Sequence, residues 1–375
     1  MMHFKTLTGL ALMASLAAFS AEARDLRLAP AAPPAHPANG VMYVNFAKYL
    51  PEESDGRLTG TILGPEVVNL GQMKDALQSQ VAEVGNLLPL YFPADFPNMA
   101  LTGELSLMGT NSQATAAAVT EYTVFCEPCQ KEMRDNGLVF LGSGASDLYE
   151  FMTTKPVKTA DDLKGLRLRS GGAPWGRLAE NFGAVPAQMS VFDQFEAVSQ
   201  GVIDGTMASV ADLISFRMVE VIKYITYVPI GMYESTSNFA TSTMTWDSLS
   251  PEDRAAMVRA ANRANTDFTH RWSAEMPAEA EAAAAEAGIE VVEPDASLVE
   301  AIQEFVSTEP ATAAELAKSN FGIEDGSARI DEFLKLVDKW TAIAEEVDND
   351  PVAMAEKIQA EVWDKVDYAT YGTAM

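Results

Sequence analysis

The sequence predicts an α/β fold of two lobes bridged by one long helix, and three observations lead to this prediction. The 375 residues are enough for two domains of about 150 residues each. Short strand-like runs alternate with helical runs over residues 24–221, which is typical of layered α/β proteins. A helix over residues 251–287 would be on the order of 55 Å long, more than one small domain needs.

The elements of the first part of the chain follow from hydrophobic periodicity and from turn residues. Residues 39–50 are expected to form a helix whose apolar face contains Val41, Val44, Phe46, Ala47 and Leu50. The predicted strands are 24–28, 58–63, 81–90, 138–142, 165–169 and the end of 201–209. The other predicted helical segments are 68–80, 161–164, 175–182, 191–200 and 212–221.

The long helix has the clearest local signals. Ser250 is the expected N-cap, Pro251 takes the first helical position, and acidic residues fill the first turn. Gly288 should end the helix, and Pro277 should kink it where it passes from one lobe to the other. Aspartate followed by proline repeats the capping signal at the start of a helix over residues 350–366.

The N-terminus has the pattern of a secretory signal peptide. One basic residue, Lys5, precedes an apolar run over residues 7–19, and Ala-Glu-Ala at residues 21–23 supplies the small-x-small cleavage pattern. The run is shorter than the roughly 20 residues that a transmembrane helix needs. We therefore expect residues 1–23 to be removed on export and the mature protein to be periplasmic. A buried N-terminal helix is the alternative, but nothing amphipathic appears in the run.

The charge excludes some partners and poses a problem for others. The sequence has 53 acidic and 26 basic residues, a net charge of -27. Such a chain is not expected to bind nucleic acid or an anionic membrane surface. An anionic ligand would also be repelled by the overall field, so a site for an anion must be built from local donors, an arginine above all.

The chemistry-bearing residue types do not predict an enzyme. Cys126 and Cys129 form a C-x-x-C pair without the histidine of a haem attachment site, so they are expected to be a structural disulfide or a free pair. His36 and His270 are the only histidines of the mature chain, and no zinc spacing, nucleophile elbow, Walker loop or dinucleotide fingerprint is present. Neither a cofactor nor a metal is expected.

The most informative segment begins with the strand over residues 165–169. Arg169 ends this strand, and Ser170-Gly171-Gly172 leaves bare backbone beside it before a helix begins near Trp175. A guanidinium next to exposed backbone N–H groups suits a carboxylate ligand. The alternative on spacing alone is that Arg169 pairs with a structural acid of the protein.

Three motifs in this region resemble a known family. The sequence reads DDLKGLRLR over residues 161–169, FGAVPAQM over 182–189 and AVSQGVIDG over 197–205. Together with LRLAP at 26–30, Gly64-Pro65 and LSPED at 249–253, these resemble the DctP-type solute-binding subunits of TRAP transporters, the tripartite ATP-independent periplasmic systems. The resemblance covers most of the mature chain.

The resemblance implies a two-lobe periplasmic binding protein fold with a hinge and a long helix spanning both lobes. Lobe 1 would comprise residues 24–147 plus 237–276, and lobe 2 residues 148–236 plus 277–310. Residues 311–375 would form C-terminal helices packed on the lobes. The chain would cross between lobes near residues 145–149 and 235–238 and at Pro277.

The resemblance also implies ligand-binding positions. Arg169 matches the arginine that grips the ligand carboxylate. Gly172, Ala173, Val191, Phe192, Met207 and Ser209 match positions that line the pocket, and Glu66, next to Gly64-Pro65, is a further candidate. Tyr149 stands where some acidic-sugar binders carry a second arginine. Trp175, Tyr91, Phe92 and Tyr233 are candidates for an apolar lining.

These departures favour an aromatic or short aliphatic monocarboxylate as the ligand, with a C4-dicarboxylate, a sugar acid or a small sulfonate as alternatives. The implied partners are the small and large membrane subunits of a TRAP permease, which would take up the acid by an ion gradient. Two other functions are considered: a ligand-binding input of a signalling receptor, and a secreted hydrolase.

Overall fold

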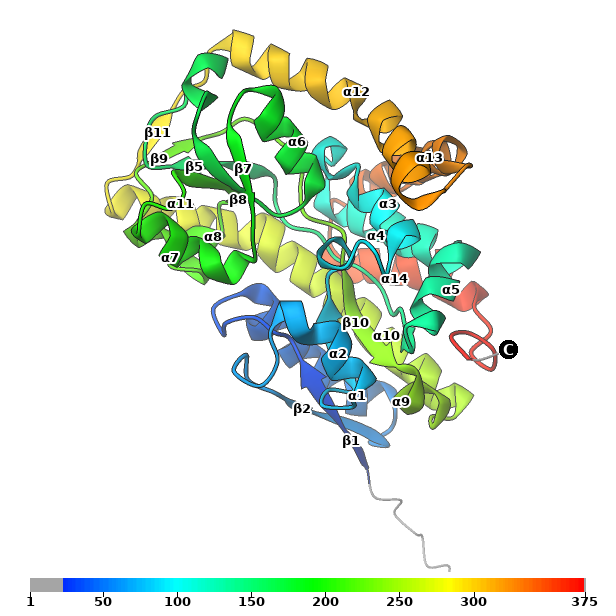
Figure 1. Cartoon of the computed structure of the whole chain (residues 1–375). Coiled ribbons are helices and arrows are strands. Elements are labelled where there is room, and N and C mark those ends of the chain that lie inside the picture. Colours follow the sequence, from blue (N-terminus) through cyan, green and yellow to red (C-terminus); the bar gives the residue numbers. More distant parts are fainter. Residues whose placement is uncertain (1–22, 374–375) are drawn as a thin grey trace, which may run out of the picture.

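Two separate β-sheets, each built from distant parts of the chain, organise the molecule (Figure 1). The structure is a computed structural model and describes residues 23–373, so the predicted signal peptide lies outside the described residues except for Ala23. The first sheet has the strand order β2-β1-β3-β10-β4, and the second has the order β11-β9-β5-β8-β6-β7.

Both sheets are mixed. The first contains β1 (Arg24–Ala29), β2 (Leu58–Ile62), β3 (Val84–Leu87), β4 (Leu138–Val139) and β10 (Ser237–Ser242). The second contains β5 (Tyr149–Thr153), β6 (Arg167–Ser170), β7 (Val185–Gln188), β8 (Gly205–Ser209), β9 (Tyr224–Thr226) and β11 (Glu290–Val292). Parallel pairs such as β1 with β3 and β6 with β8 require crossover connections, which the helices provide.

The helices pack around and between the sheets (Figure 1). They are α1 (Val44–Glu53), α2 (Met73–Gln78), α3 (Pro97–Gly103), α4 (Ser112–Phe125), α5 (Glu127–Asp135), α6 (Ala173–Asn181), α7 (Gln194–Ser199), α8 (Asp212–Ser215), α9 (Thr243–Asp247), α10 (Pro251–His270), α11 (Met276–Glu286), α12 (Ala296–Phe321), α13 (Gly326–Glu346) and α14 (Pro351–Glu361). None of the helices within residues 23–373 is long and apolar enough to cross a membrane.

The chain passes twice between the sheets before the long helix. It leaves the first sheet after β4, enters the second at β5, and returns from β9 to β10, which lies antiparallel between β3 and β4. These passages include the predicted crossings near residues 145–149 and 235–238. The α/β fold with two sheet-centred parts is as predicted, while the exact lobe boundaries stay a prediction.

The long helix is present, with the interruption close to the expected place. The hydroxyl of Ser250 accepts a hydrogen bond from the Asp253 amide at 3.1 Å, which confirms the N-cap. A π-helical turn over Arg271–Glu275 separates α10 from α11, and Pro277 stands at the start of α11, where the missing N–H costs least. Gly288 follows with φ +72°, the left-handed conformation that ends a helix.

Some element predictions are corrected by local geometry. The segment before α1 begins as a π-helical turn over Ala38–Tyr43, which shifts the register, so Met42 and Tyr43 are buried and Val44 is 47% exposed. The predicted helix 212–221 breaks after α8, because Arg217 adopts φ +59°. The strands predicted over 81–90 and 138–142 are shorter, and α14 ends at Glu361, before residue 366.

The C-terminal helices cover the outside of the molecule. Helix α13 packs on α4, and α14 packs on α10. Helix α12 runs along the top of the view, past α6 and the second sheet (Figure 1). Trp340 and Trp363 are fully buried where these helices meet the rest of the fold. Cys126 and Cys129 form a disulfide at the start of α5, so the first of the two open alternatives holds.

Candidate functional site

Arg169 is held at the end of β6 with its guanidinium buried. The side chain is only 2% exposed because β6 lies between β7 and β8, where Arg169 is in register with Ala187 and Thr206. Its Nε donates to the Met189 carbonyl at 3.2 Å and one terminal nitrogen donates to the Tyr91 hydroxyl at 3.4 Å. The other terminal nitrogen, Nη1, has no partner.

No carboxylate of the described residues forms an ion pair with this guanidinium. Among the ion pairs of residues 23–373, all defined by N···O distances up to 4.0 Å, none involves Arg169. Burial alone lowers the pKa of Arg169, but Tyr91, Tyr149 and Asp212 raise it, and the net pKa lies above its ordinary value. A buried, charged guanidinium with a free N–H is costly unless something else pairs with it.

Asp212 is the acid whose charge raises the pKa of Arg169, and its carboxylate is engaged elsewhere. Its carboxylate accepts a hydrogen bond from Gln194 Nε2 at 2.9 Å at the start of α8. Burial raises the pKa of Asp212 to about 6, against the opposing effect of Arg169. The negative charge near Arg169 is therefore partly lost in mildly acidic solution.

A cavity lies in front of Arg169, between the two sheets, and we call it the Arg169 cavity. Its volume is about 50 Å³. The second sheet contributes Tyr149 and Arg169, and the first sheet contributes Asn86 and Asn238. The remaining lining residues are Ala32, His36, Leu70, Leu88, Tyr91, Val191, Asp212, Phe216, Tyr233, Thr236, Phe268 and Trp272.

Polar atoms without partners gather in this cavity. Five buried polar atoms on its lining residues have no hydrogen-bond partner: Asn86 Oδ1, Arg169 Nη1, Tyr233 Oη, Asn238 Oδ1 and Trp272 Nε1. Each such atom costs about 1–3 kcal/mol if it stays unpaired. Because buried polar groups in proteins are nearly always paired, this concentration in one small cavity makes it the candidate site for a polar ligand.

Aromatic rings form one wall. Tyr233 lies parallel to Trp175, with ring centroids 5.9 Å apart and planes at 9°, and Tyr149 lies 4.8 Å from Trp175. Trp175 is fully buried and its Nε1 donates to the Ile230 carbonyl at 2.9 Å. Trp175 therefore supports the two tyrosines from behind, while the tyrosines themselves line the cavity.

The structure brings together part of the predicted site. Arg169, Tyr149, Val191, Tyr233 and Tyr91 all line the Arg169 cavity. Phe192 packs edge-to-face on the lining residue Phe216 at 5.6 Å, and Gly172 lies against Leu90 and Trp175. Phe92 is partly buried next to Lys74, outside the lining.

Four predicted residues lie elsewhere. Glu66 is exposed, in the turn after β2. Ala173, the first residue of α6, lines a neighbouring cavity together with Arg177. Met207 is fully buried in the second sheet opposite Phe151, and the Ser209 hydroxyl accepts a hydrogen bond from the Ala211 amide at 3.1 Å.

Several lining residues were missed by the sequence analysis. Asn86, Asn238, Trp272 and Phe268 come from β3, β10, the π-helical turn and α10, and no motif connects them. His36 was noted only as an isolated histidine. Its Nδ1 accepts a hydrogen bond from the Ala38 amide at 3.1 Å, and burial lowers its pKa to about 3, so His36 is neutral.

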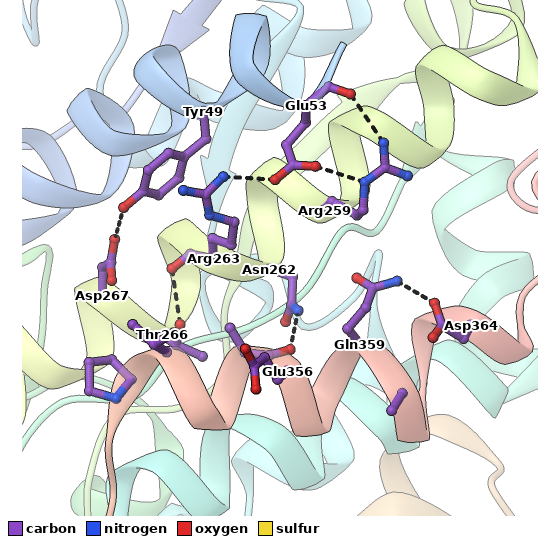
Figure 2. A pocket seen from close by; sticks show the side chains of 14 residues that line it. Tyr49, Glu53, Arg259, Asn262, Arg263, Thr266, Asp267, Glu356, Gln359 and Asp364 are labelled. Carbon is purple, nitrogen blue, oxygen red and sulfur yellow. Dashed lines mark hydrogen bonds and ion pairs between the residues drawn. The ribbon is translucent and has the colours of Figure 1, made fainter. Parts of the chain in front are cut away.

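A larger cavity lies on the outer side of the long helix, and Figure 2 shows it. This α10 groove has a volume of about 390 Å³ between α1, α10 and α14. Several of its polar side chains pair with one another. Arg259 and Arg263 both bind Glu53, at 2.8 and 2.7 Å, and Tyr49 donates to Asp267 at 2.7 Å (Figure 2).

The described part of the chain offers no metal centre, since no group of three or more His, Cys, Asp and Glu side chains within residues 23–373 converges on one point. The chemistry available at the Arg169 cavity is charge pairing, hydrogen bonding and aromatic contact.

Comparisons with known proteins identify the relatives of the chain. A family model described as bacterial extracellular solute-binding protein, family 7, matches residues 28–314. An uncharacterised protein of Salmonella typhimurium is 29% identical over 175 residues, which are 45% of this chain and 52% of that protein. This alignment thus spans about half of the relative.

This chain is similar in fold to solved structures, and the matches cover nearly the whole length of those structures. A TRAP periplasmic solute-binding protein from Bordetella bronchiseptica with bound (R)- and (S)-mandelate is 25% identical, with TM-score 0.73, and the match covers 84% of this chain and 99% of that one. A marine metagenome TRAP solute-binding protein specific for aromatic acids, in complex with 3-hydroxybenzoate, is 20% identical, with TM-score 0.75, covering 85% and 99%.

Proposed function

This chain belongs to family 7 of the bacterial extracellular solute-binding proteins, and from that premise we propose that it captures a small aromatic monocarboxylate in the periplasm for a TRAP transporter. One observation carries the proposal. Arg169 is a buried guanidinium with an unpartnered N–H that lines a cavity and forms no ion pair with the described residues.

The ligand carboxylate would pair with Arg169 and with a hydroxyl. Arg169 Nη1 and the Tyr233 hydroxyl both lack partners and both line the cavity. Each charge-assisted hydrogen bond to the carboxylate contributes about 1.5–3 kcal/mol. Such local donors offset the repulsion that a chain with net charge -27 exerts on an anion.

The rest of the lining argues against a second carboxylate. Besides Arg169, no cationic side chain lines the cavity, and His36 is neutral. Asn86 and Asn238 present amide oxygens, which would repel an anion. A C4-dicarboxylate would therefore bury one charge without a partner, at a cost of several kcal/mol.

The aromatic wall favours a ring in the ligand. Tyr149, Tyr233, Phe216 and Phe268 supply faces and edges against which an aromatic ring packs. The bound mandelate and 3-hydroxybenzoate of the two solved neighbours support the same choice, although those ligands belong to those proteins.

Capture follows from the position of the cavity between two sheets. A ligand that contacts Arg169 of the second sheet and Asn238 of the first interacts fully only when the two sheets are close together. The ligand shifts the equilibrium to the closed form by its difference in affinity for the two forms. The closed form would then deliver the acid to the small and large membrane subunits.

A thermal-shift screen tests the proposal. Benzoates and mandelates should stabilise the mature protein by about 2.7 kcal/mol at 100 times Kd, while succinate, galacturonate and taurine should give no shift. Arg169→Ala should abolish every response while the unliganded protein stays folded, and Arg263→Ala in the α10 groove should keep them. Stabilisation by succinate or galacturonate alone, or a full response in Arg169→Ala, would contradict the proposal.

A further inference from the structure

We propose that Asn238, Trp272 and Asn86 form a hydroxyl subsite in the Arg169 cavity, so that the preferred ligand is an aromatic acid carrying a hydroxyl group. This inference rests on the proposed function, in which the carboxylate of the same ligand occupies Arg169. It adds the requirement that a second polar group of the ligand both donates and accepts hydrogen bonds.

Asn238 presents a fixed acceptor. Its Nδ2 donates to Asn265 Oδ1 at 2.7 Å, and Asn265 Nδ2 donates in turn to the Leu141 carbonyl at 3.4 Å. These contacts engage the amide nitrogen of Asn238, whereas its Oδ1 has no donor among the described residues, and Asn238 is one of the residues that line the cavity. The side chain is fully buried, so solvent does not compensate.

The backbone places Asn238 at an irregularity of the first sheet. The register between β10 and β3 shifts between Ser237 and Ala240. Such bulges re-aim side chains and are frequent next to functional sites. Across the strand pair, Asn86 donates its Nδ2 to the Pro30 carbonyl at 3.5 Å, and its Oδ1 is a second acceptor without a donor.

Trp272 supplies the donor. Its ring is 7% exposed and lies 5.1 Å from both His36 and Phe268, and its Nε1–H has no acceptor. His36 cannot pair with it through Nδ1, which already accepts from the Ala38 amide. An indole N–H can only donate, so it needs an acceptor from outside the protein.

Two acceptors and one donor around the same cavity define the chemistry of the missing group. A hydroxyl satisfies both kinds, since it donates to an amide oxygen and accepts from the indole. Its single proton pairs with one of the two amide oxygens, but a hydroxyl serves an acceptor and the donor together. An ammonium group leaves the indole N–H unpaired, and a carboxylate leaves both amide oxygens unpaired. A ligand without the hydroxyl leaves the same atoms unpaired, and sites built for a hydroxyl reject such analogues strongly.

The test compares each hydroxylated acid with its parent by titration calorimetry. The pairs are the three monohydroxybenzoates against benzoate and mandelate against phenylacetate. For the wild-type protein, at least one hydroxylated acid should bind about 10-fold or more tightly than its parent. Trp272→Phe keeps an aromatic ring, although a smaller one, and removes the N–H. It should reduce that preference by about fivefold while the affinity for the parent acid changes little.

Trp363→Phe is the matched control. Trp363 is fully buried and its Nε1 also has no partner, but it does not line the cavity. Trp363→Phe should leave both affinities and their ratio unchanged. The same titrations with Arg169→Ala show separately whether the carboxylate site is correct.

The outcomes separate the two proposals. If the acids bind through Arg169 but no hydroxylated acid exceeds its parent, or if Trp272→Phe leaves the preference intact, the hydroxyl subsite is wrong and the proposed function stands. If pyroglutamate binds more tightly than every hydroxylated acid, the subsite serves an amide instead. If Arg169→Ala binds all acids as well as wild type, the proposed function itself fails.

Discussion

The α10 groove is larger than the Arg169 cavity, but fewer of the buried polar atoms in its lining lack hydrogen-bond partners. The groove is the larger, about 390 Å³ against about 50 Å³. Yet its arginines are paired with Glu53, and among the described residues of its lining Gln359 Oε1 is the one buried polar atom without a hydrogen-bond partner. The small cavity has five such atoms on residues from both sheets.

If the proposed function is correct, unpaired buried polar atoms locate the ligand site of this protein better than cavity volume does. In the groove, ion pairs, hydrogen bonds and the contact of Arg263 with the Tyr49 ring at 3.7 Å leave little for a ligand to gain. In the cavity, a ligand gains every hydrogen bond that the protein leaves unmade.

The largest expected effect is a loss of stability when Trp175, which supports the two tyrosines of the cavity wall, is replaced. Trp175→Ala removes a fully buried ring that contacts Tyr149 and Tyr233, and should lower the free energy of unfolding by about 3–5 kcal/mol. Val352→Ala in the α10 groove removes a side chain that is 64% exposed and should change it by less than about 0.5 kcal/mol. Urea unfolding measures the free energy of unfolding of both variants. Equal losses would mean that the cavity wall is packed no more tightly than the α10 groove.

The next effect is on affinity. Arg169→Lys keeps the positive charge but loses the planar fork of donors, and should weaken binding of an aromatic acid by about 10-fold or more. Arg263→Lys, in the groove, should leave the affinity within about twofold of wild type. Calorimetric titration of the best acid from the screen checks both. Equal weakening by the two variants would mean that the groove takes part in binding.

The smallest effect is on the pH dependence of binding. Burial raises the pKa of Asp212 to about 6, and a bound carboxylate nearby should raise it further. Binding is then coupled to proton uptake, so affinity should rise a few-fold as the pH falls from 7.5 to 5.5, where a carboxylic acid with a pKa of about 4 is still ionised. Asp212→Asn should flatten this profile.

Asp267→Asn is the control for that profile. Asp267 lies in the α10 groove and accepts hydrogen bonds from Asn45 and Tyr49. Its replacement should leave the pH dependence of binding as in wild type. If Asp267→Asn flattens the pH dependence of binding and Asp212→Asn does not, Asp212 is not the titrating group.

The fold was predictable where a helix or strand has one apolar face. Helix α10, whose capped start is a further signal, and the elements β6, α6 and β8 are examples. Helix α4 was missed because it is buried nearly all round and has no polar stripe to give a helical period. Strand β10 was missed because its sequence, SNFATS, is mostly polar although every residue of it is buried.

Only the site residues that lie in the family motifs, or at positions that the family resemblance singles out, were predictable from the sequence. Arg169 and Val191 belong to one continuous stretch of sequence. Tyr149 was found as a departure from the family pattern, and Tyr233 as a candidate for an apolar lining. Asn86, Asn238 and Trp272 are unremarkable in the sequence, because only the pairing of β3 with β10 and the π-helical turn bring them together. Glu66 was expected at the site, but the turn after β2 leaves it exposed.

A crystal structure of the mature protein grown with 3-hydroxybenzoate tests the central claim most directly. We predict the carboxylate within hydrogen-bonding distance of Arg169 Nη1, with the ring beside Tyr233. Ligand density in the α10 groove, or an acid bound in the cavity with its carboxylate away from Arg169, would contradict the account.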